Sequence, residues 1–161
     1  MRWEEFATAC PEIAERAEER FRADQLVMLG TLRADGSPRI SPCEIDFAAG
    51  QLFLGMMWRS RKALDLLRDP RIVVHSIQSD REASVADIKL YGHAIEILEP
   101  ELRSAFHDAI LARIEWAPSE PNHHVFAMDV IDAGYISFPD KVVLSWDRET
   151  GLRTPAFPEV E

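Results

Sequence analysis

The sequence predicts an α+β fold that is mainly antiparallel β and barrel-like, with about six to seven strands and about three helices. Several β-rich segments follow one another through tight turns, which favours antiparallel pairing over a doubly wound parallel sheet. One of these turns carries the Asp-Gly pair that is typical of a hairpin. Helical periodicity appears in three separate places, where it interrupts the run of strands.

The composition is that of a globular protein. Hydrophobic residues make up 47% and charged residues 29% of the 161 residues, which excludes a disordered chain. This length predicts one domain over 1–161. The formal net charge of −10 argues against binding to nucleic acid, because such proteins usually present a basic face.

Cysteine usage and hydropathy bear on the compartment. Cys10 and Cys43 have no CxxC spacing, so neither a zinc site nor a disulfide framework is predicted. The N-terminal residues contain many acids and no apolar core of signal-peptide length, and no 18-residue apolar run occurs. We therefore expect a cytoplasmic protein that does not enter a membrane.

The first third of the chain predicts one helix and three strands. Pro11 fits the first position of an amphipathic helix over about 11–22. Apolar segments separated by RADGS and by AAGQ predict strands near 25–33, 38–47 and 51–57.

The remainder predicts two more helices and further strands. Ser60 is a candidate N-cap for a short helix over about 61–68, which the sequence RDP ends. A second helix begins at Pro100. The segments that predict strands are 71–79, 88–98, HVFAMDVIDAGYISF with a turn around Asp132 to Gly134, and KVVLSWD.

The stretch MMWRSRKALDLLRDPRIV concentrates positive charge in an acidic protein. It lies where a strand runs into a helix, and the free amides of a helix's first turn favour an anion. Arg59, Ser60 and Lys62 around that turn are the residue types that recognise phosphate. A capped surface helix with solvated charges is the alternative. We expect Arg61, Arg68 and Arg71 to be solvated or paired with Asp65 and Asp69.

A second feature precedes this stretch. In GSPRISPCEIDF, Arg39 and Ser41 occupy alternate strand positions and so point to one face, opposite Ile40. Pro38 and Pro42 flank them, and proline in a strand implies an edge, a bulge or an interrupted ladder. An ordinary exposed strand face is the alternative interpretation.

Together these residues resemble a known family. The order GTLRADGSPRISPCEIDFAAGQLFLGMMWRSRKALDLLRDPRIVVHS is similar to the pyridoxamine 5'-phosphate oxidase-like family of flavin-binding split β-barrels. The resemblance covers the first half of the chain closely and LYGHAIEI with the final strands more loosely. It implies an antiparallel split β-barrel that forms a homodimer, with FMN near the subunit interface. In some branches the deazaflavin F420 replaces FMN, and the sequence leaves this choice open.

The resemblance also assigns residues. It implies that Arg59, Ser60 and Lys62 contact the cofactor phosphate. It places Arg39, Ile40, Ser41 and Pro42 along the isoalloxazine ring and ribityl chain, with Met56 and Met57 backing the adjacent strand. Arg39 is our hypothesis for a positive group near the pyrimidine edge of the flavin.

The C-terminal part departs from the family pattern. Trp146, Arg148 and Arg153 in SWDRETGLRTPAFP match the family's substrate signature only weakly, so no vitamin B6 oxidation is assigned and the catalytic residues stay unknown. Trp146 is a candidate to stack on the cofactor, with a place in the core as the alternative. Cys43 is expected to pack in the core.

Histidine spacing does not predict a metal site. The five histidines lack HxxxH or HExxH spacing, and the adjacent His123 and His124 would face opposite ways in a strand. Two functions remain open at this point. One is an FMN- or F420-dependent oxidoreductase that acts on a small molecule, and the other is a carrier domain that binds flavin or heme without turnover.

Overall fold

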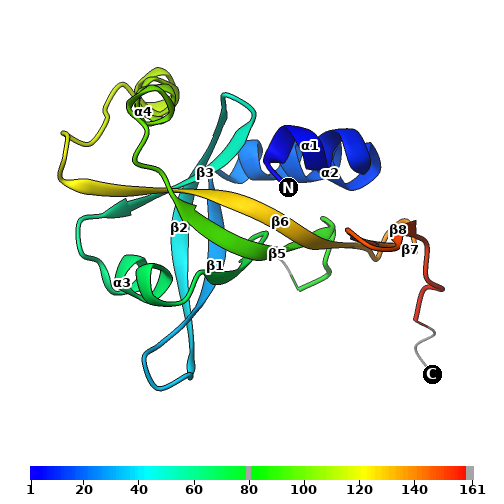
Figure 1. Ribbon diagram of the computed structural model, residues 1–161. Coiled ribbons are helices and arrows are strands. Elements are labelled where there is room, and N and C mark those ends of the chain that lie inside the picture. Colours follow the sequence, from blue (N-terminus) through cyan, green and yellow to red (C-terminus); the bar gives the residue numbers. More distant parts are fainter. Residues whose placement is uncertain (79–80, 159–161) are drawn as a thin grey trace.

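In the part of the chain that the structure describes, eight strands form one antiparallel sheet, and six of them close into a barrel (Figure 1). The structure, a computed structural model, describes residues 1–78 and 81–158. The strand order is β3-β2-β1-β4-β5-β6-β7-β8, and pairing of β3 with β6 closes the barrel. The strands are β1 (Leu26–Leu32), β2 (Pro38–Ala48), β3 (Gln51–Met57), β4 (Arg71–His75), β5 (Asp87–Glu96), β6 (His123–Ser137), β7 (Val142–Asp147) and β8 (Gly151–Arg153).

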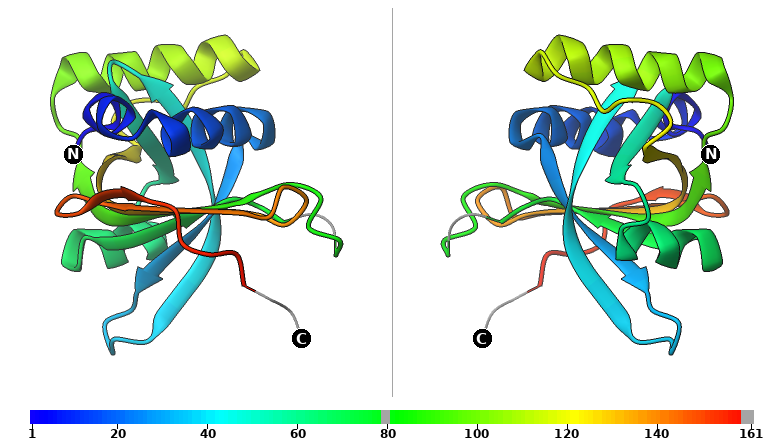
Figure 2. Two further views of the ribbon diagram at one scale, coloured as in Figure 1. Left: turned by 90° about the vertical axis from the view of Figure 1, so that its right-hand side faces the viewer. Right: turned by 90° about the vertical axis from the view of Figure 1, so that its left-hand side faces the viewer.

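Within residues 1–78 and 81–158, four helices accompany the sheet. They are α1 (Trp3–Ala9), α2 (Pro11–Asp24), α3 (Arg61–Arg68) and α4 (Pro100–Ile114). Figures 1 and 2 show α1, α2 and α4 on one side of the long strands β5 and β6, and α3 on the other. Within the described residues, these helices lack the combination of length and apolar character that a membrane span requires.

Strand β3 is buried on both faces. Leu52 and Leu54 point into the main core, which fills the barrel and continues beneath α1 and α2. Phe53 points the other way into a second cluster, where it meets Phe106 of α4 with ring centroids 5.7 Å apart. The sequence QLFLGMM is apolar without alternation because both of its faces are covered.

The predicted turn around Asp132 to Gly134 is wrong. Strand β6 runs through these residues, because its backbone pairs with β5 on one side and β7 on the other. The irregularity is a shift of register between Tyr91 and Gly92 of β5. A Cβ atom on Gly92 would lie 2.0 Å from the carbonyl oxygen of Asp129, so the close approach of the strands requires glycine.

Other differences concern the first helix, the fourth strand and the last strand. The helix α1 was not predicted, because it is one short segment with only Trp3 and Phe6 buried and so shows little periodicity. The predicted strand over 71–79 ends at His75, and Ser79 lies outside the described residues. The segment RETGLR turns the chain as expected, and its last residues form the short strand β8.

Candidate functional site

The helix α3 begins directly after the tight turn that follows β3. Arg59 in this turn has φ 54°, a left-handed conformation that is unusual for arginine. Ser60 occupies the N-cap position, as predicted, but its hydroxyl makes no capping bond. The Ser60 Oγ atom is buried and has no hydrogen-bond partner in the described part of the chain. The helix start therefore presents a hydroxyl and first-turn amides with unused donor capacity.

Two contacts tie α3 to β2. The ammonium group of Lys62 donates a hydrogen bond to the carbonyl oxygen of Pro42. One turn later, Asp65 Oδ2 accepts a hydrogen bond from Arg39 Nε at 2.6 Å. These contacts bring the segment from Arg39 to Pro42 against the start of α3, so the two groups of residues that the sequence singled out lie together.

Asp65 is the centre of a buried polar cluster. Its carboxylate also accepts a hydrogen bond from Thr31 Oγ1 at 3.0 Å and forms an ion pair with Arg68 at 3.2 Å. Burial by itself raises the pKa of Asp65, but the bonds from Arg39, Thr31 and Arg68 outweigh it and lower the pKa below its usual value. Asp65 is therefore ionised at neutral pH.

The alternation on β2 follows the prediction. Ser41 lies on the inner side, opposite Leu29, whereas the side chain of Ile40 is 71% exposed on the outer side. The Ser41 Oγ atom is buried and, among the described residues, has no hydrogen-bond partner. A second hydroxyl without a partner thus lies on the strand that α3 faces.

The end of β3 supplies an aromatic stack. Met56 is buried and Met57 is 79% exposed. The next residue, Trp58, lies flat on the imidazole of His124, with centroids 4.5 Å apart and planes 9° apart. His124 Nδ1 is 3.1 Å from Glu96 Oε1, so the buried imidazole that supports Trp58 is itself held in place.

Trp146 does not join these residues. It is only 2% exposed and packs edge-on against Phe6 of α1, with ring centroids 5.0 Å apart. Since α1 covers it, the indole has no free face for a cofactor, and the predicted stacking role is wrong. The alternative, a place in the core, is what the structure contains, and Cys43 is buried as expected.

The remaining charges of the basic stretch divide as predicted. Arg68 pairs with Asp65, and Arg71 pairs with Asp69 at 2.6 Å. Hydrogen bonds from Arg71 lower the pKa of Asp69 to about 2. Arg59 and Arg61 are exposed, and neither forms an ion pair within residues 1–78 and 81–158. Positive charge that is free to meet an anion is therefore concentrated at the start of α3.

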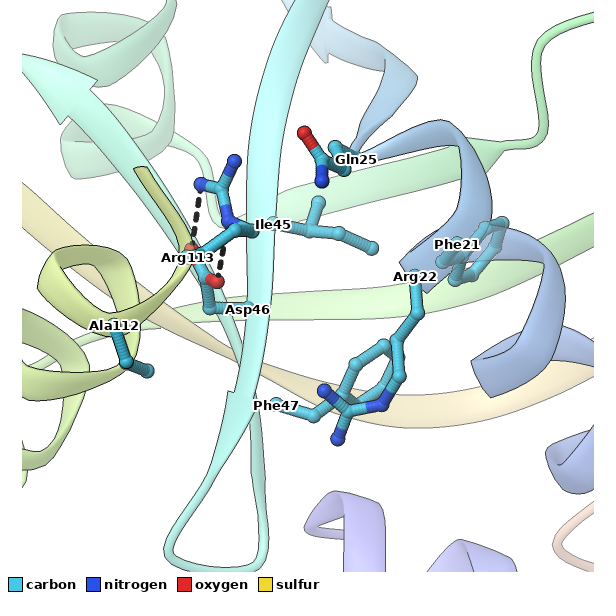
Figure 3. Close-up of a pocket in the computed structure, with 9 residues that line it drawn as sticks. Phe21, Arg22, Gln25, Ile45, Asp46, Phe47, Ala112 and Arg113 are labelled. Atoms are coloured by element: carbon cyan, nitrogen blue, oxygen red, sulfur yellow. Dashed lines mark hydrogen bonds and ion pairs between the residues drawn. The ribbon is translucent and has the colours of Figure 1, made fainter. Parts of the chain in front are cut away.

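A separate cleft lies elsewhere on the barrel (Figure 3). It has a volume of about 420 Å³ and is lined by residues of α2, β2 and α4, and none of the predicted cofactor residues lines it. In Figure 3, Arg113 of α4 forks onto Asp46, with Nε 2.9 Å from Oδ1. The guanidinium of Arg22 lies over the ring of Phe47. Since its cations already have partners, this cleft mainly marks where α4 is fixed to β2.

The two adjacent histidines lie in different surroundings. His123 Nε2 is 3.3 Å from a guanidinium nitrogen of Arg103, on the side of α4, whereas His124 stacks on Trp58. Burial lowers the pKa of His123, which favours its neutral form. Among the described residues, no three His, Cys, Asp or Glu side chains form a group that could hold a metal ion.

Comparison with known proteins identifies the family. The family described as pyridoxamine 5'-phosphate oxidase matches residues 13–137, which is most of the chain. The chain belongs to this family. Proteins of the pyridoxamine 5'-phosphate oxidase-like fold typically bind flavin and commonly form dimers. No curated protein matches the sequence.

Solved structures with the same fold support this assignment. A heme binding protein from Mycobacterium smegmatis aligns with TM-score 0.65 and 18% identity over 91% of this chain. The chain spans only 58% of that protein. A protein from Clostridium acetobutylicum related to general stress protein 26, of the pyridoxinephosphate oxidase family, aligns with TM-score 0.64 and 14% identity over 84% of this chain and 94% of its own. A conserved hypothetical protein from Mycobacterium tuberculosis aligns with TM-score 0.66 and 16% identity over 76% of this chain and 83% of its own. At these identities the likeness shows the fold.

Sequence reasoning missed two groups of residues at the site of this family member. Asp65 holds Arg39 and accepts a hydrogen bond from Thr31, 34 residues earlier, so only pairing of β1 with β2 and packing of α3 bring these residues together. The stack of Trp58 on His124 depends on the pairing of β3 with β6. One signal was present: Asp65 follows Lys62 by three residues and so lies on the same side of the helix.

Proposed function

We propose that this protein binds FMN and acts as an oxidoreductase on a small molecule. The observation that carries the proposal is the pair of buried hydroxyls, Ser41 and Ser60, that lack partners within the described residues beside a helix start and its cations. Buried donors are rarely left unpaired in proteins, so one on β2 and one at the start of the helix that Lys62 ties to β2 favour a ligand with several acceptor oxygens. A phosphate group has that chemistry and suits a helix N-terminus.

The residues of this chain divide into two roles. Ser60, Lys62 and Arg59 bind the phosphate, with a hydroxyl, an ammonium group and a guanidinium around the first-turn amides. Arg39 and Ser41 contact the remainder of the cofactor from the inner side of β2, whereas Ile40 and Pro42 shape the same strand. Met56 and Met57 provide the apolar edge beside it. The flavin supplies the redox chemistry when bound, and these residues bind it, orient it and exclude water.

The proposal includes a homodimer, with the second copy on the outer face of the barrel. The paired residues Ile40, Gly30, Val73 and Tyr91 form a row across the outer face of β2, β1, β4 and β5. Ile40 and Tyr91 are exposed by 71% and 44%. Exposed apolar side chains at both ends of this row favour an interface with another protein surface. A homodimer formed through this face would lie beside the strand that carries Arg39 and Ser41.

Three other ligands or roles stay open as alternatives. F420 also has a phosphate group and would use the same cations. A carrier of flavin would bind the cofactor without turnover. Heme is the third, because one protein of this fold is described as heme binding. These alternatives differ in the ligand or in turnover, so a spectrum and a reduction assay separate them.

The visible spectrum of the purified protein and the mass of the small molecule released on denaturation test the proposal. Oxidised FMN gives an absorption band at about 450 nm, and heme gives an intense Soret band. Reduction of bound flavin by NAD(P)H, and its reoxidation by an added acceptor, would indicate an enzyme. A protein that binds FMN but shows no turnover with any donor would support the carrier instead.

A further inference from the structure

We infer that Asp65 is a positioning residue that orients Arg39 toward the bound cofactor. This inference rests on the proposed function. Asp65 does not reach outward itself, because its side chain is only 6% exposed. Its contact to Arg39 uses the Nε atom, and the two terminal nitrogens of that guanidinium have no hydrogen-bond partner within the described residues. Asp65 therefore fixes the Nε atom of Arg39 and leaves the two terminal guanidinium nitrogens available for a ligand.

The burial of the pair supports a fixed orientation. The side chain of Arg39 is 20% exposed, so most of its length is enclosed between β2 and α3. Thr31 occupies a third side of the carboxylate, and it is paired directly with Arg39 across β1 and β2. Three elements thus define the position of one carboxylate. An arginine held in this way loses less conformational entropy when it binds a ligand.

Two explanations predict opposite effects of neutralising Asp65 on the affinity for FMN, one based on charge and one on the orientation of Arg39. A carboxylate beside an anion site repels the anion, so its neutralisation should strengthen anion binding if Coulomb energy decides. If orientation decides, its neutralisation should weaken binding, because the guanidinium loses its anchor and samples other rotamers. The sign of the change in affinity therefore separates the two explanations.

The substitutions Asp65→Asn, Arg39→Gln and their combination test the inference, with FMN affinity measured by titration. We expect D65N to weaken FMN binding about tenfold, as for the loss of one charge-assisted hydrogen bond. In the R39Q background the same change should have no further effect on affinity. The matched control is Asp69→Asn, which removes the exposed pair with Arg71 at the other end of α3 and should leave affinity unchanged.

A second measurement is independent of ligand. In the protein without FMN, the Nε–H proton of Arg39 should exchange slowly with water by NMR, and D65N should make this exchange fast. Unchanged exchange in D65N overturns the inference, as does an FMN affinity that rises or stays the same. Failure of the wild-type protein to bind FMN, with the slow exchange intact, overturns the proposed function and the ligand role of Arg39 with it. Thr31→Val removes one donor from the Asp65 carboxylate and retains Arg39, so it keeps the inference testable if D65N fails to fold. It should weaken FMN binding about twofold and quicken exchange of the Arg39 Nε–H proton, and no change in either overturns the inference.

Discussion

Lys62 and Pro42 are joined by a hydrogen bond that links the first turn of α3 to the carbonyl oxygen of β2. This bond uses one of the three donor protons of the ammonium group, so the others remain available for a ligand. It also places the positive charge between the helix start and the strand that carries Ser41. The cation is thus held beside the helix amides and the hydroxyls of Ser41 and Ser60, which lack partners among the described residues and favour an anion.

Lys62→Met should weaken binding of FMN about tenfold, because a charge-assisted contact to the phosphate is lost. Binding of riboflavin, which lacks the phosphate, should change little. Titration of both flavins measures the ratio of the two affinities. Lys141→Met is the matched control, since Lys141 is exposed in the turn before β7. Equal losses for FMN and riboflavin would place Lys62 away from the phosphate.

Ser60→Ala should affect binding without lowering stability. The Ser60 hydroxyl is buried without a partner in the described structure, so its removal costs no hydrogen bond and relieves an unsatisfied polar group. We expect an unchanged or slightly raised Tm in the ligand-free protein and a several-fold weaker affinity for FMN. Thermal unfolding with and without FMN measures both effects. A large fall in Tm with unchanged affinity would assign the hydroxyl a structural role.

Stability should fall at alkaline pH because of Cys43. Burial raises the pKa of this thiol to about 11 from the usual 9.0. Between these values the unfolded chain loses the proton while the native protein keeps it, so the free energy of unfolding decreases as pH rises. The full shift corresponds to about 3 kcal/mol. Urea unfolding at pH values from about 8 to about 11 measures how steeply the free energy of unfolding falls with pH. This slope should be smaller in Cys43→Ala. An identical slope in both proteins would contradict the assignment.

Gly92→Ala should destabilise the protein by about 2 to 4 kcal/mol. Its Cβ atom would lie 2.0 Å from the carbonyl oxygen of Asp129, and backbone cannot move away without breaking the β5–β6 ladder. Gly134→Ala is the matched control, because no atom lies within 4 Å of a Cβ there. Chemical denaturation compares the two variants. Equal stability of both variants would show that the backbone at the register shift between Tyr91 and Gly92 can move to accommodate a Cβ atom.

Tyr91→Glu should dissociate the proposed dimer. The charge would stand at the β5 end of the outer row, next to Val73, and its burial against a second copy would be costly. Light scattering after gel filtration gives the mass of the particle. Leu111→Glu on α4, where the leucine is 45% exposed, is the control and should leave the mass unchanged. A wild-type monomer would contradict the proposed dimer, and a Y91E variant that stays dimeric would place the interface elsewhere.

Much of the fold could be predicted because it depends on local signals. The Asp-Gly turn, the proline at the start of α2 and the serine before α3 each determine backbone geometry within a few residues. The turn predicted at Asp132 to Gly134 failed because these residues are tolerated in a strand that pairs on both sides. Pairing with neighbours outweighed their turn propensity.

The site was predictable in part for a similar reason. Arg59, Ser60 and Lys62 lie in one short motif, so their types and spacing indicated a candidate anion site. The partnership of Arg39 with Asp65 joins a strand to a helix 26 residues later, and it depends on packing that no local pattern encodes. Trp146 was misassigned because α1, which covers it, carries too little periodicity to be recognised.

Comparative titration of the purified protein, freed of ligand, with FMN and riboflavin tests the central claim most directly. The site at Ser60 and Lys62 predicts saturable FMN binding with one cofactor per chain and an affinity at least about tenfold higher than for riboflavin, since the phosphate provides the charge-assisted contacts. Equal affinities for the two flavins, or no binding of FMN, would contradict the claim that this helix start holds a flavin phosphate.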